Sequence, residues 1–239
     1  MQDVLKTRFQ EVSGGRMLDV ATNNGQFIQR IIESFKDYRE IIGIDIDEHL
    51  LTKAKELSQI NNYRNVGFLQ MNSENLDFFD NCFDVVSISN SLHHLYNIGK
   101  SLDEMKRVLR KDGYFIIAEM FSDVKRQSQQ SHVLFHHWVA KIDTLTGIYH
   151  CSTYKKDEIV EIAKKLKFSE LEILEQNNAI SNPFDESVIA KITEFIDTTI
   201  LRVKGFDAYH ALYRTGEEIK SHIHKNGWES APQIIIICT

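Results

Sequence analysis

The chain has 239 residues, of which 42% are hydrophobic, and its 34 acidic and 28 basic residues give a net charge of −6 at pH 7. This length and apolar content predict one globular domain over residues 1–239. The acidic balance disfavours a nucleic-acid partner, because general nucleic-acid binders are more often basic. The three cysteines are widely spaced and predict no disulfide framework, which favours a cytoplasmic location. The longest apolar runs have the length of strands, so no membrane partner is expected.

Short apolar runs alternate with helical patterns along the first half of the chain. The runs at 17–21, 41–46, 66–71, 83–89 and 114–120 are rich in Ile, Val and Phe and do not alternate cleanly. Such runs are typical of strands buried on both faces of a parallel sheet. Between them, apolar residues recur at helical spacing, as at Leu50, Ala54 and Leu57. The alternation predicts an α/β fold with helices on both faces of the sheet.

The regular alternation of strand and helix patterns does not continue in the second half of the chain. Residues 171–174 and 233–238 have strand patterns, and an apolar helical stripe runs from Ile159 to Leu166. Residues 121–153 have no strand pattern, and residues 178–228 have a mostly helical pattern. We interpret these two segments as helical lid insertions within the same domain. The second segment, 178–228, is also a candidate homodimer interface.

The stretch MLDVATNNGQF, residues 17–27, leads from the first predicted strand into a loop. Open parallel sheets bind ligands at this carboxyl edge. A pyrophosphate would favour G-x-G-x-x-G, because each glycine lets the backbone approach the phosphates. Here only Gly25 is present, without a Lys or Arg, so NAD and FAD are disfavoured. Asn tolerates positive φ and offers both donors and acceptors, which suits an amino-acid carboxylate and ammonium.

Two acids support a ligand site at this edge. Asp45 ends the second predicted strand, where a carboxylate can accept hydrogen bonds from both ribose hydroxyls. Asp19 lies at the end of the first strand, where it can cap the turn or reach a ligand ammonium through water. For Asp45, the alternative is an acid that stabilises a helix N-terminus.

Four stretches taken together resemble the class I S-adenosylmethionine-dependent methyltransferases, and in particular their small-molecule, type 11-like group. They are LDVATNNGQF, GIDID, FLQMNSENLDFFDNCFDVVSISNSLHHL and VLRKDGYFIIAE, over roughly residues 15–120. The resemblance implies a Rossmann-like seven-stranded sheet of order 3-2-1-4-5-7-6, with the last strand antiparallel, and residues 233–238 fit that strand. It also implies S-adenosyl-L-methionine as cofactor and a small-molecule acceptor.

The resemblance assigns residues of this chain to the cofactor. The motif that holds the methionine end matches Asp19, Ala21, Asn23 and Gly25. Asp45 matches the ribose-binding acid, with Ile46 packing on the adenine. Asn72 and Ser73 stand where the adenine amino group is contacted, and Asn90 stands where backbone lines the methionine moiety. The chain departs from the family pattern at Ala21 and Asn23, which replace glycines, and at Asn72, which replaces aspartate.

Methyl transfer from a sulfonium is one in-line displacement, so the protein mainly positions the acceptor, with or without a general base. The candidate catalytic residues are His94, which follows the fourth strand, and Glu119, which ends the fifth strand and is expected to face the same open rim; either one can instead be structural. The sequence NSLH after the fourth strand lacks the prolines of relatives that methylate adenine-N6 or glutamine.

The segment 132–150 holds four of the ten histidines. His136, His137 and Tyr149 in this segment are candidate substrate-binding residues, because aromatic side chains of both insertions favour an enclosed, partly apolar pocket. His132 and His136 share a helical face, but the glutamate of H-E-x-x-H is missing and no third ligand is identifiable. The sequence therefore predicts no metal site.

Three alternatives stay open. The departures in the loop suggest a non-catalytic, S-adenosylmethionine-binding regulatory protein on the same fold. A nicotinamide-dependent oxidoreductase is disfavoured by the missing G-x-G-x-x-G, and a protein or RNA methylase by the acidic charge and the enclosed lid. The sequence does not reveal whether oxygen, nitrogen or carbon accepts the methyl group.

Overall fold

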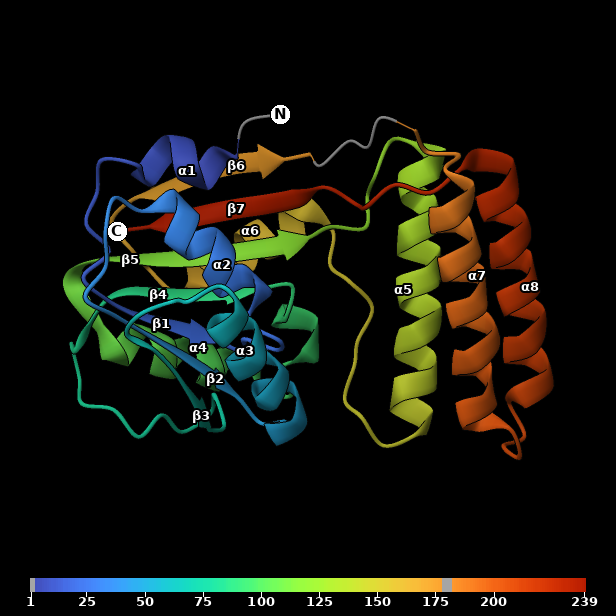
Figure 1. The fold of residues 1–239 in the computed structure, drawn as a ribbon, viewed down its shortest axis with the longest axis horizontal. Coiled ribbons are helices and arrows are strands. Elements are labelled where there is room, and N and C mark those ends of the chain that lie inside the picture. Colours follow the sequence, from blue (N-terminus) through green and yellow to red (C-terminus); the bar gives the residue numbers. More distant parts are fainter. Residues whose placement is uncertain (1–2, 178–181) are drawn as a thin grey trace.

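The computed structural model describes residues 3–177 and 182–239. Within them, seven strands form one sheet in the order β3-β2-β1-β4-β5-β7-β6 (Figure 1). The strands are β1 (Arg16–Val20), β2 (Glu40–Asp45), β3 (Val66–Gln70), β4 (Phe83–Ser89), β5 (Leu109–Met120), β6 (Leu171–Gln176) and β7 (Gln233–Cys238). Strands β1 to β5 are parallel to one another, and β7 is antiparallel to β5 and β6. The predicted α/β fold, strand order and antiparallel last strand are confirmed.

Helices cover both faces of this sheet, which explains why its strands are apolar on both sides. Successive residues of a strand point to opposite faces. Val85 and Ile116 pack with α1 (Val4–Phe9) and α2 (Gln26–Ser34), whereas Val86 and Ile117 pack with α4 (Ile98–Val108) and α6 (Lys156–Lys165). Helix α3 (Glu48–Ile60) lies against β2 and β3. Each of these strands therefore buries side chains on both faces of the sheet.

A further layer of helices stands beyond the carboxyl ends of β4 and β5 (Figure 1). It contains α5 (Gln127–Leu145), α7 (Glu186–Thr199), the short 3₁₀ helix η2 (Ile200–Val203) and α8 (Tyr209–Asn226). This layer has its own core, in which buried Trp138 packs with apolar side chains of α7 and α8. The Trp138 indole Nε1–H donates a 2.8 Å hydrogen bond to the carbonyl of Leu212. Helices thus occur in both segments predicted to be helical insertions, and residues 178–181 of the second lie outside the described residues.

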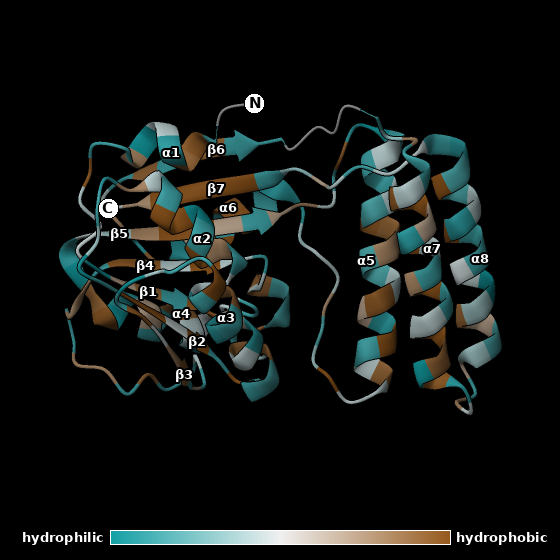
Figure 2. Cartoon of the chain, in the orientation of Figure 1, coloured by the Kyte–Doolittle hydropathy of each residue, from teal (hydrophilic) through white to brown (hydrophobic). Residues whose placement is uncertain are grey.

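Figure 2 shows hydrophobic residues concentrated along β4 and β7, whereas α5, α7 and α8 mix hydrophobic and hydrophilic residues. In the part of the chain that the structure describes, no helix has the length and apolar character needed to cross a bilayer.

Candidate active site

The loop after β1 makes left-handed bends without the glycines that usually allow them. Ala21 and Asn23 have φ angles of 54° and 52°, and Gly25 has a φ of 80°. Non-glycine residues adopt this region at a cost, which is smallest for Asn and Asp. A Cβ on Gly25 would lie 3.2 Å from the Cβ of Ala54, so helix α3 closes against the loop at this point. The departures seen in the sequence therefore leave a tightly bent loop in place.

Asp45 joins the end of β2 to this loop. Its Oδ2 accepts the backbone N–H of Asn23 at 2.8 Å, and its Oδ1 accepts the N–H of Asp47 at 3.0 Å. A carboxylate oxygen has two lone pairs, so each one retains capacity for another donor, such as a ribose hydroxyl. The next residue, Ile46, is 70% exposed and offers an apolar surface beside the carboxylate. This pair fits the ribose and adenine of the predicted cofactor.

Asp19 is a buried carboxyl group beneath the same loop. The Ser87 hydroxyl donates to its Oδ1 at 2.7 Å. Within the described chain, neither its Oδ2 nor the buried hydroxyl of Thr22 makes a hydrogen bond of normal geometry. Burial raises the pKa of Asp19 to about 7. A nearby cation stabilises the ionised form of such a group, so Asp19 fits a ligand that carries an ammonium or sulfonium.

The other predicted cofactor residues have partners within the protein. Asn72 Oδ1 accepts the N–H of Glu74 at 2.9 Å, and the hydroxyls of Ser73 and Ser101 lie 2.9 Å apart. Asn90 has a φ of 45°, and its Oδ1 accepts from the N–H of Met120 and the amide of Gln233, both at 3.0 Å. Their assignment to the cofactor stays a prediction.

Glu119 lies beneath the surface and not at the open rim where the sequence placed it. It is 0% exposed, and its Oε2 accepts the backbone N–H groups of Ser91 and Leu92 at 3.0 and 2.9 Å. Its Oε1 lies 3.1 Å from His93 Nδ1, at the distance but not at the angle of a hydrogen bond. The carboxylate therefore supports the loop after β4 from below.

Histidines from three segments meet beside this loop. His93 and His94 lie in the 3₁₀ helix η1 (Leu92–His94), His136 lies on α5, and His150 follows α5. One ring nitrogen from each residue lies within 4.8 Å of those of the other three. The ring centroids of His94 and His150 are 3.9 Å apart, and those of His93 and His136 are 4.9 Å apart. We call these four residues the histidine cluster.

Sequence reasoning missed this cluster because it paired His136 with His132. His132 lies outside the cluster, and its Nδ1 accepts the backbone N–H of Ala231 at 2.9 Å. The available signals were the density of histidines in 132–150 and the His-His pair after the fourth strand. No local spacing connects those two signals.

The surroundings keep the imidazoles of His94 and His136 neutral. Burial, reinforced by the neighbouring histidines, lowers the pKa of His94 to about 3 and that of His136 to about 2. His94 nevertheless keeps an exposed edge. A neutral imidazole presents a nitrogen lone pair, which can accept a proton or bind a metal.

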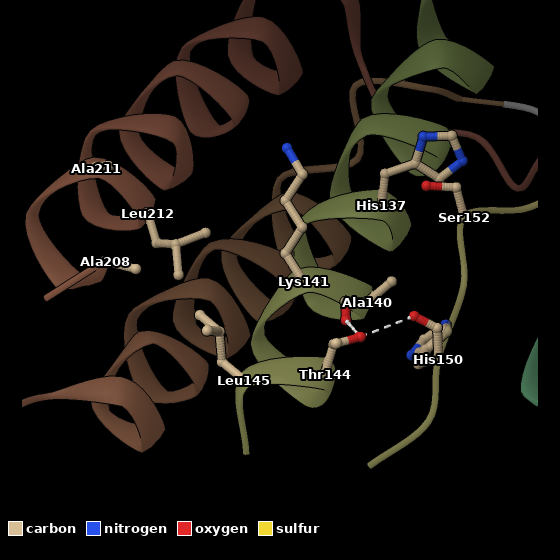
Figure 3. A pocket seen from close by; sticks show the side chains of 10 residues that line it. All are labelled: His137, Ala140, Lys141, Thr144, Leu145, His150, Ser152, Ala208, Ala211 and Leu212. Atoms are coloured by element: carbon tan, nitrogen blue, oxygen red, sulfur yellow. Dashed lines mark hydrogen bonds between the residues drawn. The ribbon is translucent and has the colours of Figure 1, made fainter. Parts of the chain in front are cut away.

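A groove of about 430 Å³ opens between α5, the segment after it and the start of α8 (Figure 3). Its volume is in the range of small-molecule sites. Its lining includes His137, Lys141 and Thr144 of α5, His150 and Ser152, and Ala208 and Leu212. The groove and the histidine cluster therefore share His150.

The structure separates the three predicted substrate residues. His136 belongs to the histidine cluster, whereas His137 lines the groove and lies 2.8 Å from the Thr153 hydroxyl through its Nε2. Tyr149 lies at the surface against Tyr96, with ring centroids 5.2 Å apart. Their contact with a substrate stays a prediction.

The fold is that of an enzyme that takes a methyl group from S-adenosyl-L-methionine. A family model described as a methyltransferase domain matches residues 11–178, and the chain belongs to that family. A curated relative, the ubiquinone/menaquinone biosynthesis C-methyltransferase of Rickettsia prowazekii, is 36% identical over 113 residues, which is 46% of this chain and 45% of the relative. The chain spans about half the length of the curated relatives it matches.

Solved structures share the fold at low identity. The YcgJ protein of Bacillus subtilis aligns with a TM-score of 0.59 and 18% identity, over 98% of this chain and 95% of that one. The phosphoethanolamine N-methyltransferase 2 of Haemonchus contortus, solved with S-adenosyl-L-methionine, aligns with a TM-score of 0.58 and 19% identity, over 98% of this chain and 51% of that one.

Proposed function

We propose that the chain transfers a methyl group to a small-molecule acceptor held between the carboxyl edge of the sheet and the helical layer. The observation that carries this proposal is the groove beside α5, which shares His150 with the histidine cluster. His94 of that cluster comes four residues after Asn90, at the carboxyl end of β4. The histidine cluster therefore lies between the groove and the end of β4, where the predicted cofactor residue Asn90 stands.

The cofactor, when bound, supplies a methyl group already activated on a sulfonium. The work of the chain is then to hold and orient the two reactants, which can contribute roughly 7–11 kcal/mol to lowering the barrier. Asp45 and Ile46 receive the nucleoside, and the bent loop with Asp19 beneath it receives the amino-acid end. The helical layer covers the acceptor and excludes water.

The lining of the groove favours a small, partly apolar acceptor. Ala140, Leu145, Ala211 and Leu212 provide apolar surface, and Lys141 adds a cation at its edge. An acceptor with an aromatic or aliphatic body and one polar or anionic group fits this lining. His137, which lines the groove, would orient that polar group.

The curated relatives guide the choice of acceptors. Several are named as C-methyltransferases of ubiquinone and menaquinone biosynthesis. Hydroxylated aromatic rings therefore belong among the acceptors to be tested. The match spans less than half of this chain, so phenols, amines and thiols belong in the same panel.

A labelled-transfer experiment tests the proposal. The protein is incubated with S-adenosyl-L-methionine tritiated in the methyl group and with a cell extract separated into small-molecule, protein and RNA fractions. We expect label to enter the small-molecule fraction, and Asp45→Ala to lower this transfer when the cofactor is supplied below its saturating concentration.

Two results would contradict the proposal. Label in the protein or RNA fraction would indicate a macromolecular acceptor. Cofactor binding without transfer to any fraction or any member of the panel would favour a regulatory protein on the same fold.

A further inference from the structure

The histidine cluster has the geometry of an assembled metal site. Its four ring nitrogens, one from each residue, lie within 4.8 Å of one another. In a tetrahedral site with metal–nitrogen bonds of about 2.1 Å, ligand nitrogens lie about 3.4 Å apart. Small rotations of the side chains close that difference. We propose that His93, His94, His136 and His150 bind one divalent transition-metal ion.

Unused nitrogen atoms in the cluster are the first support. Both ring nitrogens of His93, Nδ1 of His136 and Nε2 of His150 are buried and make no hydrogen bond within the described residues. Buried polar atoms are nearly always paired, because an unpaired one costs desolvation energy. Several unpaired imidazole nitrogens at one point are explained by an ion that takes their lone pairs.

Carboxylates behind the rings are the second support. Asp143 Oδ2 lies 2.6 Å from His150 Nδ1, which leaves the unpaired Nε2 of His150 as the ligand atom. Asp143 is itself held by Arg202, whose Nη1 lies 2.7 Å from Oδ1. Glu119 Oε1 lies 3.1 Å from His93 Nδ1 without the angle of a hydrogen bond, so a rotation of the ring would bring the two into a similar pairing. Metal-binding histidines usually donate their second N–H to such a carboxylate, which fixes the ring and raises its basicity.

The burial of Glu119 is the third support. Its side chain is fully buried, and Oε1 makes no hydrogen bond within the described chain. A buried carboxyl oxygen without a hydrogen-bond donor costs desolvation energy. A metal bound to Nε2 of His93 would fix the N–H of that ring on Nδ1, which faces Glu119.

Hydrogen bonds connect the segments that carry the ligands. The Cys151 backbone N–H donates to the carbonyl of His93 at 2.9 Å. The Thr144 hydroxyl lies 2.9 Å from the carbonyl of Ala140 and 3.1 Å from that of His150, which joins α5 to the segment that follows it (Figure 3). The cluster is therefore organised before any ion arrives.

The donor set indicates the class of ion. Imidazole nitrogen suits Zn²⁺, Co²⁺, Ni²⁺ and Cu²⁺, whereas Mg²⁺ and Ca²⁺ prefer oxygen ligands. His94 has an exposed edge, so one ligand faces the solvent side of the site. If the proposed function holds, an acceptor that carries a metal-binding heteroatom would reach the ion from that side, as a fifth ligand or in place of His94.

A titration of the full-length, chelator-treated protein tests the proposal directly. Co²⁺ and Zn²⁺ are added while heat and, for Co²⁺, visible absorption are recorded. We expect one equivalent of either ion to bind, with the visible bands of Co²⁺ in a nitrogen site. His136→Ala and His150→Ala should each weaken binding at least tenfold. Asp143→Asn, which keeps all four ligands, should weaken it about 10- to 100-fold.

His224→Ala is the matched control, because His224 is an exposed histidine on α8 outside the cluster. It should bind both ions as the unaltered protein does. S-adenosylhomocysteine affinity, measured for every variant, reports that each one is folded and keeps the cofactor site.

Binding of Co²⁺ by the unaltered protein no tighter than by the His136→Ala/His150→Ala double variant would overturn the proposal. A loss of Co²⁺ binding in His224→Ala as large as the loss in His136→Ala or His150→Ala would also overturn it. Because the readout is metal binding, the proposed function can fail in the transfer experiment while the metal site stands, and the reverse also holds.

Discussion

Asp45 accepts the backbone N–H of Asn23 at 2.8 Å, so the end of β2 fixes the loop that follows β1. This bond explains how a loop with a single glycine keeps its left-handed bends. Asn23 also accepts the N–H of Asn24 on its own Oδ1, at 2.7 Å. The Asn23 side chain thus stabilises the bend that glycine would have allowed.

Asp45→Ala is expected to weaken binding of S-adenosylhomocysteine by about 1–3 kcal/mol, because the ribose hydroxyls lose an acceptor and the loop loses its anchor. Calorimetry measures this change. Asp47→Ala is the matched control: Asp47 caps α3 by accepting from His49 and Leu50, so its loss should lower stability and leave affinity unchanged. Equal affinity in Asp45→Ala and the unaltered protein would remove Asp45 from the cofactor site.

Asp19 makes the stability of the ligand-free protein depend on pH. Its pKa is about 7 in the fold, above the ordinary 3.8, so its contribution to stability is present below pH 3.8 and is lost as pH rises through 7. Between pH 3.8 and pH 7, the unfolding free energy of the unaltered protein should fall by roughly 4 kcal/mol relative to that of Asp19→Asn. Thermal unfolding of both proteins from pH 4 to 8 measures the difference. Parallel curves would mean that Asp19 is ionised throughout.

His94 should matter to turnover more than to cofactor binding. It lies after β4 with its pKa lowered to about 3, so it is neutral over the whole assay range. His94→Ala is expected to lower kcat about 10²-fold, with no inflection near pH 6.5 in the profile of the unaltered protein. Tyr96→Phe, which alters an exposed neighbour, is the control. An unchanged kcat in His94→Ala would leave His94 without a part in the reaction.

Trp138 should carry much of the stability of the helical layer. It is 1% exposed, packs in the core of that layer and donates to the carbonyl of Leu212. Trp138→Ala should cost about 3–5 kcal/mol of unfolding free energy, and Trp138→Phe less, because the phenyl ring refills part of the space. Denaturant unfolding provides both values. A loss below about 1 kcal/mol in Trp138→Ala would show that the layer does not depend on this core.

The sheet could be predicted from sequence because its signals are local. The run 83–89 matches β4, and the run 233–238 matches β7, since strands covered on both faces must be apolar at every position. The order of the strands came from the resemblance, because apolar runs alone do not specify their neighbours. The bends at Ala21 and Asn23 were foreseen only for Asn, which tolerates positive φ by itself.

The site was harder to predict because its parts are distant in sequence. His94 and His150 are 56 positions apart, yet their rings lie 3.9 Å apart, and no local period encodes that contact. Glu119 ends a strand whose carboxyl end faces the ligand edge, so exposure was a natural expectation. The loop after β4 folds over it and buries it, which depends on tertiary packing.

Calorimetry of the unaltered protein with S-adenosylhomocysteine, with NAD as control, tests the central claim most directly. The claim is that the glycine-poor loop, together with Asp45 and Asp19, holds an S-adenosyl ligand. It predicts micromolar binding of S-adenosylhomocysteine and none of NAD. Binding of NAD alone, or of neither ligand, would contradict it and would mean that the loop no longer forms the cofactor site.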